Sequence, residues 1–368
     1  MSPVAPDRAL FSRYPHLVTQ LPFIKLGQLP TPVSRLDALQ RELRPHLDDG
    51  HLWVKRDDIS AADYGGNKIR KLEFLLAEAK QQGCSSVLTF GGLGSNHALA
   101  TSLNCRRLGL HCIAILTPEP ATAAVRRTLL YHQLLGTQIE VATRYALARE
   151  IADEARKDRG PDAVYEIPFG GSSWMGATGF VNAAFELADQ VATGQCPEPD
   201  VIYLGCGTAG STAGLALGLQ LAGLKSRIEA IQVTPDSIQP ARLYQTLFEE
   251  TAAELQRLDP AITLQGLDVA AVKVRGDQLG EGYAIPTPAA REAAELAERN
   301  EQMPVSLTYT AKALAALIAD ARAGLLAGKR VLFWNTYNSR PYPPLPDDDG
   351  WKGLPESLHA LFNNQALF

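Results

Sequence analysis

Short apolar runs alternate with amphipathic helical patterns over most of the chain. The runs are rich in β-branched and aromatic residues, and each is bounded by polar or turn residues, so they predict strands. The predicted strands are LWVKR (52–56), SVLTF (86–90), CIAIL (112–116), QIEVA (138–142), AVYEI (163–167), VIYLG (201–205), IEAIQV (228–233), AAVKV (270–274) and RVLFW (330–334). Strands that are separated by helical crossovers favour parallel sheets covered by helices, which is an α/β fold.

The helical patterns between the strands have clear ends. In KIRKLEFLLAEAKQQG (68–83), Leu72, Leu75, Leu76 and Ala79 recur at intervals of three and four, and Gly83 marks the end. The apolar stretch AGLALGLQLAG (213–223) is too short to span a membrane and predicts a buried helix.

The chain has 368 residues, which is long for a single hydrophobic core and favours two domains. We expect a smaller α/β domain at 66–180, inserted in a larger domain made of 1–65 and 181–368. Each domain should contain a parallel sheet covered by helices. The proline-rich segment SRPYPPLPDDDG (339–350) predicts a surface loop.

Composition excludes several classes of function. The net charge is −5 and there is no basic block, so nucleic-acid binding has no electrostatic support. The five cysteines form no CxxC pair, so we expect neither a metal site nor a disulfide framework. Residues 1–17 lack the basic and apolar regions of a signal peptide. We therefore expect a cytoplasmic protein that binds neither nucleic acid nor membrane.

The stretch DYGGNKIRKLEF (63–74) places lysines where a helix begins. Lys68 follows a glycine pair, and Lys71 comes one helical turn later on the same side. A helix N-terminus carries partial positive charge, which disfavours a cation there. Either the site is exposed and tolerates the charge, or an anionic group belongs between the two lysines.

Two further segments follow predicted strands. TFGGLGSNHALATSLN (89–104) brings Ser95, Asn96 and His97 to the start of a helix. The carboxyl ends of parallel strands are where ligands bind in α/β sheets, although Ser95 or Asn96 can also serve only as an N-cap. YLGCGTAGSTAGLALG (203–218) predicts a phosphate cradle made by backbone N–H groups and the hydroxyls of Thr208, Ser211 and Thr212.

The glycines of this second segment also fit the GxGxxG pattern of a nicotinamide-dependent dehydrogenase. That fold needs an acidic residue at the end of the next strand, whereas Glu229 stands at the beginning of that strand. The pattern therefore favours a phosphate over a dinucleotide. The chain also lacks the GK[ST] sequence of a nucleoside-triphosphatase loop.

Three later segments carry polar groups on loops or helix starts. They are GEGYAIP (280–286) with Tyr283, LTYTAKALAAL (307–317) with Tyr309 and Thr310, and FWNTYNS (333–339) with Thr336. Taken alone, each tyrosine is typical of packing and each threonine of a cap. Together with the lysines and the phosphate cradle, they favour a small phosphorylated aldehyde cofactor that forms a Schiff base, namely pyridoxal phosphate.

The sequence resembles the pyridoxal-phosphate enzymes that include 1-aminocyclopropane-1-carboxylate deaminase and D-cysteine desulfhydrase, of the tryptophan-synthase-β-like fold. The resemblance covers most of the chain. It is carried by LPTPVSRL (29–36), LWVKRDD (52–58), GGNKIRKLE (65–73), GGLGSNH (91–97), GTAGSTAGL (207–215), GEGYAIP (280–286) and YTAKA (309–313). It implies a homodimer that acts on a small amino acid.

The resemblance also implies roles for individual residues. Lys68 resembles the lysine that binds the cofactor covalently, and Asn96 the residue that bonds the 3′-oxygen of the pyridine ring. Ser95 and His97 would face the substrate together with Asn96, and Tyr283 and Tyr309 resemble a pair of active-site tyrosines. Lys68, Ser95, Tyr283 and Tyr309 form the implied catalytic set. The implied phosphate ligands are Lys71, Gly207, Thr208, Ala209, Gly210, Ser211 and Thr212.

Two departures from the family pattern bear on the substrate. Thr310 stands where the cyclopropane deaminases have Glu, and NTYNS stands where HTGG is common, with Tyr337 and Asn338 in place of glycines. Thr336 keeps the threonine position near the pyridine nitrogen. A hydroxyl there leaves the nitrogen mostly neutral, which suits the loss of a good leaving group.

These departures favour a lyase or deaminase of the D-cysteine desulfhydrase type, which releases a 2-keto acid and ammonia by α,β-elimination. The alternatives are 1-aminocyclopropane-1-carboxylate deaminase activity, diaminopropionate ammonia-lyase activity, and a pyridoxal-phosphate-binding protein without catalysis.

Overall fold

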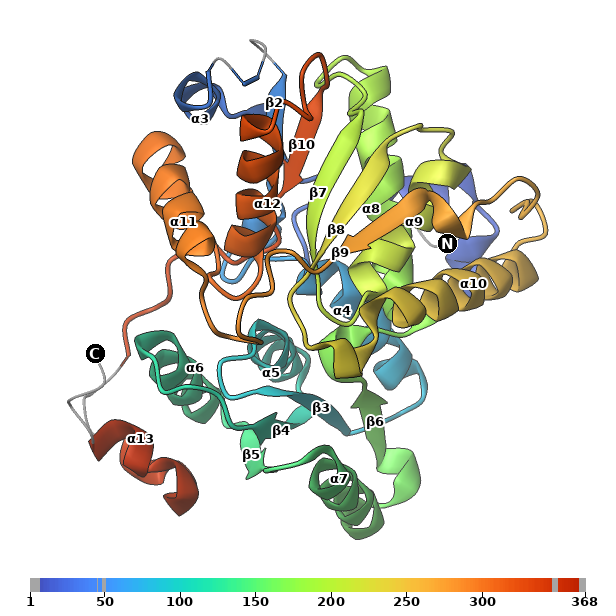
Figure 1. The fold of residues 1–368 in the computed structure, drawn as a ribbon. Helices are drawn as coiled ribbons and strands as arrows, with labels where there is room; N and C mark the ends of the chain where they lie inside the picture. The colour runs from blue at the N-terminus through green and yellow to red at the C-terminus, as the bar shows by residue number, and fades with distance from the viewer. Residues whose placement is uncertain (1–6, 45, 48–50, 346–349, 364–368) are drawn as a thin grey trace. The chain divides into compact units, whose positions relative to one another are not determined.

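A computed structural model describes residues 7–44, 46–47, 51–345 and 350–363 (Figure 1). The chain divides into two compact units. The larger takes the chain up to Leu21, Lys25–Phe74 and Ser172–Arg340, and the smaller takes Pro22–Ile24, Leu75–Gly171 and the chain from Pro341. As domain boundaries, 66 and 180 stay a prediction.

The larger unit contains a six-stranded sheet with the order β1-β2-β10-β7-β8-β9. All neighbours are parallel except β1 and β2, which are antiparallel. The strands are β1 (Val33–Arg35), β2 (Leu52–Lys55), β7 (Val201–Cys206), β8 (Arg227–Gln232), β9 (Val272–Arg275) and β10 (Val331–Trp334). The five predicted strands of this unit are confirmed, and β1 was not predicted.

Helices cover both faces of this sheet (Figure 1). On one face α3 (Asp37–Glu42), α11 (Pro288–Glu301) and α12 (Thr310–Arg322) share a core with Val331 and Phe333 of β10. On the other face lie α8 (Trp174–Ala192), α9 (Gly210–Leu221) and α10 (Pro240–Leu258), and Phe180 of α8 packs against Trp334 with ring centroids 6.1 Å apart. The alternation of Phe333 and Trp334 between the faces follows from the two-residue period of a strand.

Close packing of α8 on α9 depends on small residues. A Cβ at Gly214 would overlap the carbonyl oxygen of Ala177, so the two helices approach backbone to backbone. This unit also contains the short α-helices α1 (Ala9–Arg13) and α2 (Leu17–Gln20). The helix α4 (Lys68–Gln81) begins in the larger unit and continues into residues of the smaller one, and Gly83 with φ +74° follows its end, as predicted.

The smaller unit has a four-stranded parallel sheet with the order β5-β4-β3-β6. Its strands, all of them predicted, are β3 (Ser86–Gly92), β4 (His111–Thr117), β5 (Gln138–Val141) and β6 (Val164–Ile167). Ala114 and Leu116 of β4 pack under α5 (Asn96–Leu108) and α6 (Ala123–Leu134), while Ile113 and Ile115 face α7 (Tyr145–Arg159). The α/β fold with two helix-covered, mainly parallel sheets is therefore confirmed.

Residues 350–363 pack within the smaller unit. Leu354 and Leu358 join the cluster formed by α5 and α6, and the short helix α13 (Ala360–Asn363) follows. In the loop predicted at 339–350, residues 341–345 have neither helix nor strand, and residues 346–349 lie outside the described residues.

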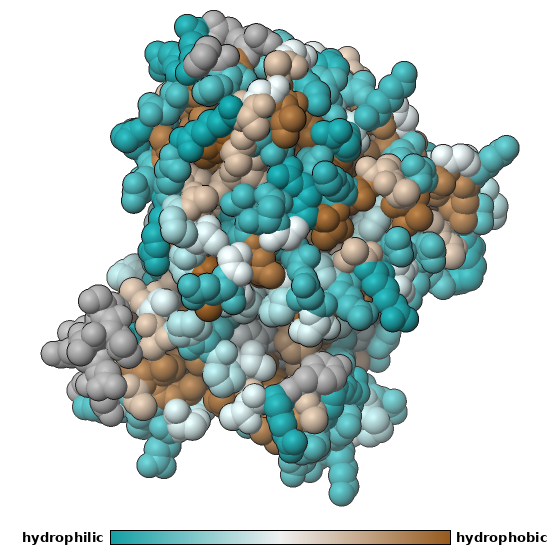
Figure 2. Space-filling model, in the orientation of Figure 1, coloured by the Kyte–Doolittle hydropathy of each residue, from teal (hydrophilic) through white to brown (hydrophobic). Residues whose placement is uncertain are grey.

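Hydrophilic side chains predominate on the face seen in Figure 2, with hydrophobic ones in separate groups among them. The large hydrophobic side chains that are exposed in the described ranges are Leu134, Ile238, Ile285 and Leu325, which lie on different elements. All five cysteines are free and buried. Within the described ranges, no helix combines the length and the hydropathy needed to cross a membrane.

Candidate functional site

Lys68 is the first residue of α4, immediately after a tightly packed glycine pair. A Cβ at Gly65 would overlap the carbonyl oxygen of Asp58, and Gly66 has φ +98°, so both positions require glycine. The Lys68 Nζ atom donates a hydrogen bond to Asn67 Oδ1 at 3.1 Å. The side chain is half-buried, and burial of the ammonium lowers the pKa of Lys68 to about 8. A pKa of about 8 leaves a fraction of the Lys68 amine neutral near physiological pH, and the neutral form is the nucleophile.

Lys71 lies one turn along α4, and its side chain is almost fully buried. Its Nζ atom lies 3.4 Å from Ser172 Oγ and 2.8 Å from the place that a Cβ on Gly210 would take. Burial lowers the pKa of Lys71 well below its usual value, and the charge of Lys68 lowers it further. The two amines are therefore close enough to repel each other.

The glycine-rich loop after β7 meets these lysines. Ala209 has φ +61° and α9 begins at Gly210, so the loop turns sharply into the helix. Ser211 Oγ accepts a hydrogen bond from Asn67 Nδ2 at 3.0 Å, and Thr208 Oγ1 lies 2.7 Å from Ser172 Oγ. In the first turn of a helix, backbone N–H groups have no acceptor within the helix.

Two more residues of the loop are Thr212 and Gly207. Thr212 is fully buried beside the thiol of Cys206, and a Cβ at Gly207 would make only ordinary contacts, at 3.6 Å or more. The structure thus brings the lysines and the glycine-rich loop together, as the sequence predicts.

The donor set at this place fits a phosphorylated aldehyde. The buried Lys71 lies at the start of α9 beside the Ser172 hydroxyl, and the half-buried Lys68 is linked to Ser211 of α9 through Asn67. A phosphate would offset the repulsion between the amines and would accept hydrogen bonds from the first turn of α9. The amine of Lys68, with its lowered pKa, fits the aldehyde carbon.

Asn67 and Ser172 belong to this arrangement but were not predicted as site residues. Asn67 stands between the glycine pair and Lys68, and its amide bonds both Lys68 and Ser211. Ser172 belongs to the sequence GGSS (170–173), a polar glycine turn that comes shortly after a predicted strand. That position relative to the strand is the signal that would have found Ser172.

The two tyrosines form a pair in the larger unit. The hydroxyl groups of Tyr283 and Tyr309 bond to each other, and the rings meet edge to face with centroids 5.9 Å apart. Tyr309 also borders the glycine-rich loop, because a Cβ at Gly207 would lie 3.8 Å from its Cε1 atom. Lys312 Nζ donates to the carbonyl oxygens of Leu279 and Gly282, so it ties the loop that carries Tyr283 to α12.

Thr310 and Thr336 take different positions. Thr310 is fully buried, and its Oγ1 accepts a hydrogen bond from the backbone N–H of Ser306 at 2.7 Å, in the turn that precedes α12. The backbone oxygen of Thr336 accepts a hydrogen bond from the Asn67 N–H at 3.2 Å. The structure thus places Thr336 next to the lysine hinge, while the contact of either hydroxyl with a pyridine nitrogen stays a prediction.

Ser95, Asn96 and His97 belong to the smaller unit, at the carboxyl end of β3. Ser95 is the N-cap of α5, and its Oγ accepts a hydrogen bond from the Ala98 N–H at 3.2 Å. Asn96 and His97 form the first turn, and Glu119 Oε2 accepts from the Gly94 N–H at 2.9 Å in the preceding glycine turn. Capping uses an acceptor lone pair of Ser95 and leaves its proton for another partner. The roles of the three residues toward cofactor and substrate stay predictions.

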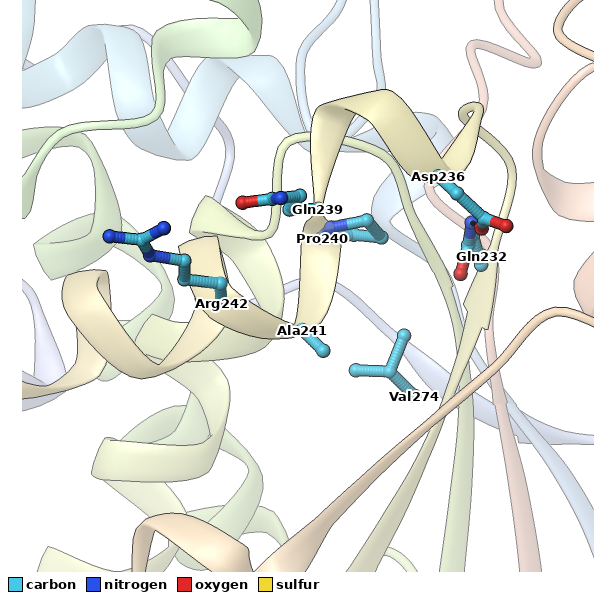
Figure 3. Close-up of a pocket in the computed structure, with 7 residues that line it drawn as sticks. All are labelled: Gln232, Asp236, Gln239, Pro240, Ala241, Arg242 and Val274. Atoms are coloured by element: carbon cyan, nitrogen blue, oxygen red, sulfur yellow. Dashed lines mark hydrogen bonds between the residues drawn. The ribbon is translucent and has the colours of Figure 1, made fainter.

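A surface pocket of about 440 Å³ lies elsewhere in the larger unit (Figure 3). Gln232, Asp236, Gln239, Pro240, Ala241, Arg242 and Val274 line it, and none of them is a predicted site residue. Two of its polar side chains are paired with each other, because Gln232 Nε2 donates to Asp236 Oδ1 at 2.7 Å, and Gln232 Nε2 also donates to the Thr234 carbonyl oxygen at 2.9 Å. The glycine-rich loop and the lysines remain the stronger candidate site.

Comparison with known proteins indicates the same cofactor as the geometry of the site. Residues 24–336 match the family model described as pyridoxal-phosphate dependent enzyme. D-cysteine desulfhydrases of Salmonella choleraesuis (strain SC-B67) and Salmonella schwarzengrund (strain CVM19633) are each 34% identical to this chain over 318 residues, which cover 82% of this chain and 89% of each relative.

Solved structures extend the comparison. An ACC deaminase homologue is 28% identical, with a TM-score of 0.74 over 98% of this chain and 100% of that one. The processed form of threonine deaminase isoform 2 from Solanum lycopersicum, 14% identical, has a TM-score of 0.60 over 92% of each chain and shares the fold.

Proposed function

Because the chain belongs to the family of pyridoxal-phosphate-dependent enzymes, we propose that it is an elimination lyase of the D-cysteine desulfhydrase type. Its cofactor is pyridoxal phosphate. The proposed reaction converts D-cysteine and water into pyruvate, hydrogen sulfide and ammonia, with every atom accounted for. The observation that carries the proposal is the placement of Lys68 and Lys71 at the glycine-rich loop, which Asn67 joins to α4 through Ser211.

The residues of the larger unit would divide the work between holding the cofactor and moving protons. Lys68 Nζ would hold the aldehyde carbon, and Lys71 with residues 207–212 would hold the phosphate. When bound, pyridoxal phosphate withdraws electrons from the substrate α-carbon. The lowered pKa of Lys68, about 8, suits an amine that accepts the α-proton near neutral pH.

The pair of Tyr283 and Tyr309 would protonate the leaving group. The Tyr283 and Tyr309 hydroxyls share a hydrogen bond, so either can donate a proton while the other stabilises the oxygen that remains. A proton delivered to the departing sulfur makes hydrogen sulfide the product. Protonation also prevents the thiolate from returning to the β-carbon.

The residues at the start of α5 would serve the cofactor and the substrate. Asn96 would bond the 3′-oxygen of the cofactor and contribute to the substrate side. Ser95 would contact the substrate carboxylate or the transferred proton, and His97 would face the substrate. Thr310 or Thr336 would bond the ring nitrogen through a hydroxyl, which leaves that nitrogen mostly neutral. A neutral ring favours expulsion of a good leaving group such as thiolate.

A second candidate is 1-aminocyclopropane-1-carboxylate deaminase activity, which the similarity to the ACC deaminase homologue favours. That reaction adds water to the cyclopropane amino acid and gives 2-oxobutanoate and ammonia. Loss of the β-amino group of diaminopropionate is a related alternative. A protein that binds the cofactor without turnover is the alternative from another class.

The absorbance spectrum of the purified protein and of Lys68→Ala, before and after D-cysteine is added, tests the proposal. We expect a visible or near-ultraviolet cofactor band in the wild type that is lost or shifted to the free-aldehyde form in Lys68→Ala. D-cysteine should change the wild-type spectrum, and pyruvate and sulfide should form in equal amounts. A wild type that holds the cofactor but releases 2-oxobutanoate from the cyclopropane amino acid, and nothing from D-cysteine, would decide for the second candidate.

Two further expectations belong with this proposal. The five buried free cysteines fit a reducing compartment, so we propose that the enzyme acts in the cytoplasm. The family resemblance implies a homodimer. Light scattering on the eluted peak of a sizing column gives the molar mass, and a value near 39.8 kDa, that of one chain, would contradict the dimer.

A further inference from the structure

The hinge that precedes Lys68 is held by the chain that follows β10. The Gly65 N–H donates to Asn338 Oδ1 at 2.7 Å, and the Asn67 N–H donates to the Thr336 carbonyl oxygen at 3.2 Å. The two bonds come from residues on either side of Gly66, so the hinge is fixed at both ends. All these residues belong to the larger unit.

Asn338 is itself firmly placed. Its side chain is buried, with 4% of its surface exposed. Its Oδ1 also accepts from the Arg340 N–H at 3.1 Å, and its Nδ2 donates to the Arg340 carbonyl oxygen at 3.2 Å. Arg340 in turn donates from Nε to the Ala61 carbonyl oxygen at 2.9 Å. The amide is therefore locked in the orientation that receives Gly65.

The other side of the hinge is also tightly packed. The Gly66 N–H donates to the Asp57 carbonyl oxygen at 2.8 Å, and the Ser60 hydroxyl donates to the Gly66 carbonyl oxygen at 2.8 Å. Gly65 is buried, so bulk solvent does not reach its N–H in the folded chain. A buried N–H that loses its acceptor costs free energy. Without the Asn338 amide, the Gly65 backbone would therefore favour another conformation, and glycine allows a wide range of φ and ψ.

From this arrangement we infer that Asn338 is a positioning residue for the cofactor lysines: through Gly65, it holds the start of α4 in the orientation that Lys68 and Lys71 need. The inference rests on the proposed function in that it assigns the cofactor to these lysines. Asn338 touches neither lysine in this role, since the hinge transmits its effect along the backbone.

The Asn338 side chain supplies a hydrogen-bond acceptor, which a glycine at this position lacks. The family pattern commonly has glycine at this place, and glycine would leave both the Gly65 N–H and the Arg340 N–H without this acceptor. The departure from the pattern at Asn338 thus adds a fixed link between the end of β10 and the lysine hinge.

The test is the affinity of Asn338→Ala for pyridoxal phosphate, measured by absorbance titration, beside a matched variant. Asn182→Ala is the match, because Asn182 is equally buried and its Oδ1 likewise accepts one distant backbone N–H, that of Leu10, at 3.0 Å. Both variants should lower the melting temperature. We expect the dissociation constant of the cofactor to rise about tenfold in Asn338→Ala and to stay within about twofold of wild type in Asn182→Ala.

Equal dissociation constants in the two variants would overturn the positioning role. If Asn338→Ala does not fold, amide hydrogen exchange of the wild type tests the positioning role of Asn338 instead. If the role is correct, saturating pyridoxal phosphate slows the exchange of a peptide that covers residues 61–67. An unchanged exchange rate in that peptide would overturn the role. A wild type that binds the cofactor but does not turn over D-cysteine contradicts the proposed substrate and leaves both measurements valid. A wild type that binds no pyridoxal phosphate removes the proposed function and the positioning role together.

Discussion

Asn67 donates a hydrogen bond from its side-chain Nδ2 to Ser211 Oγ over 3.0 Å, and so joins the start of α4 to the start of α9. The Oδ1 atom of the same amide accepts from Lys68 Nζ at 3.1 Å. A single side chain therefore sets the spacing between the amine that would bind the aldehyde and the loop that would bind the phosphate. Both ends of the cofactor depend on that spacing.

Replacement of Asn67 by alanine should weaken cofactor binding. The loss of two hydrogen bonds, one of them to an ammonium group, should raise the dissociation constant of pyridoxal phosphate about tenfold, as measured by absorbance titration. Asn300→Ala is the control, because the Asn300 amide donates to the Leu296 carbonyl oxygen within α11, far from the lysines in sequence. Equal affinities in Asn67→Ala and Asn300→Ala would contradict the role of Asn67.

The glycine-rich loop offers a test of the phosphate site with two single-methyl additions. A Cβ at Gly210 would lie 2.6 Å from Ser172 Oγ and 2.8 Å from Lys71 Nζ, whereas a Cβ at Gly276, which lies outside the loop, would have Gln232 Oε1 at 3.7 Å as its nearest neighbour among the described residues. We expect Gly210→Ala to weaken the binding of pyridoxal phosphate at least tenfold by displacing Lys71, and the control Gly276→Ala to stay within about threefold of wild type. Inorganic phosphate, used as a competitor in the same titration, should lose affinity in parallel in Gly210→Ala. Strong binding by Gly210→Ala would show that the phosphate lies elsewhere.

Much of this fold could be read from local patterns. The strands that form the interior of each sheet are continuous apolar runs, because both of their faces are covered, and such runs stand out in the sequence. The strand β1 (Val33–Arg35) has no such run. It forms because its backbone pairs antiparallel with β2 at the sheet edge, and the sequence of three residues does not encode that partner.

The site likewise contains residues that local sequence patterns predict and residues that they do not. Lys68, Lys71 and the glycine-rich loop could be predicted because each has a local signature in its own segment. Asn67 and Ser172 could not, because their importance comes from partners far along the chain: 144 residues separate Asn67 from Ser211, and 101 separate Lys71 from Ser172. Only the folded chain shows which distant polar groups meet.

The bond between Tyr283 and Tyr309 predicts that their effects on catalysis are not independent. Each Tyr→Phe change removes one hydroxyl from a shared hydrogen bond, so we expect kcat/KM to fall about 10²-fold in either single variant. The double variant should be little worse than the singles, because the second loss removes an interaction that is already broken. Initial rates of pyruvate formation from D-cysteine give these values.

Tyr244→Phe serves as the control for that pair, since the Tyr244 hydroxyl donates to a backbone group, the Val269 carbonyl oxygen, at 2.8 Å. It should keep wild-type kcat/KM. Fully additive losses in Tyr283→Phe and Tyr309→Phe would mean that the two hydroxyls act in separate steps and that their bond has no part in catalysis.

Arg70, between the two cofactor lysines in sequence, anchors α4 in a buried ion cluster. Arg70 Nη1 donates to Glu186 Oε2 at 2.9 Å, Arg70 Nε donates to Asp57 Oδ2 at 2.8 Å, and Lys55 pairs with Glu186. Burial alone would raise the pKa of Glu186, but the charges of Arg70 and Lys55 and their hydrogen bonds hold it at about 2. Glu186 therefore stays ionised and compensates two buried cations.

Because of this cluster, the free energy of unfolding should decrease as the pH falls. The pKa of Glu186 is about 2 in the folded protein against 4.5 ordinarily, so its contribution is complete above pH 4.5 and is lost as the pH falls toward 2. Glu186→Gln should lower the free energy of unfolding by about 3–5 kcal/mol at pH 7, because the cations lose their counter-charge. Urea unfolding at a series of pH values should show that the difference in the free energy of unfolding between Glu186→Gln and wild type shrinks between pH 4.5 and 2.

The exposed pair of Glu292 with Arg322 provides the control: Glu292→Gln should lower the free energy of unfolding by at most about 1 kcal/mol. If both substitutions cost the same at pH 7, the buried cluster is not what anchors α4.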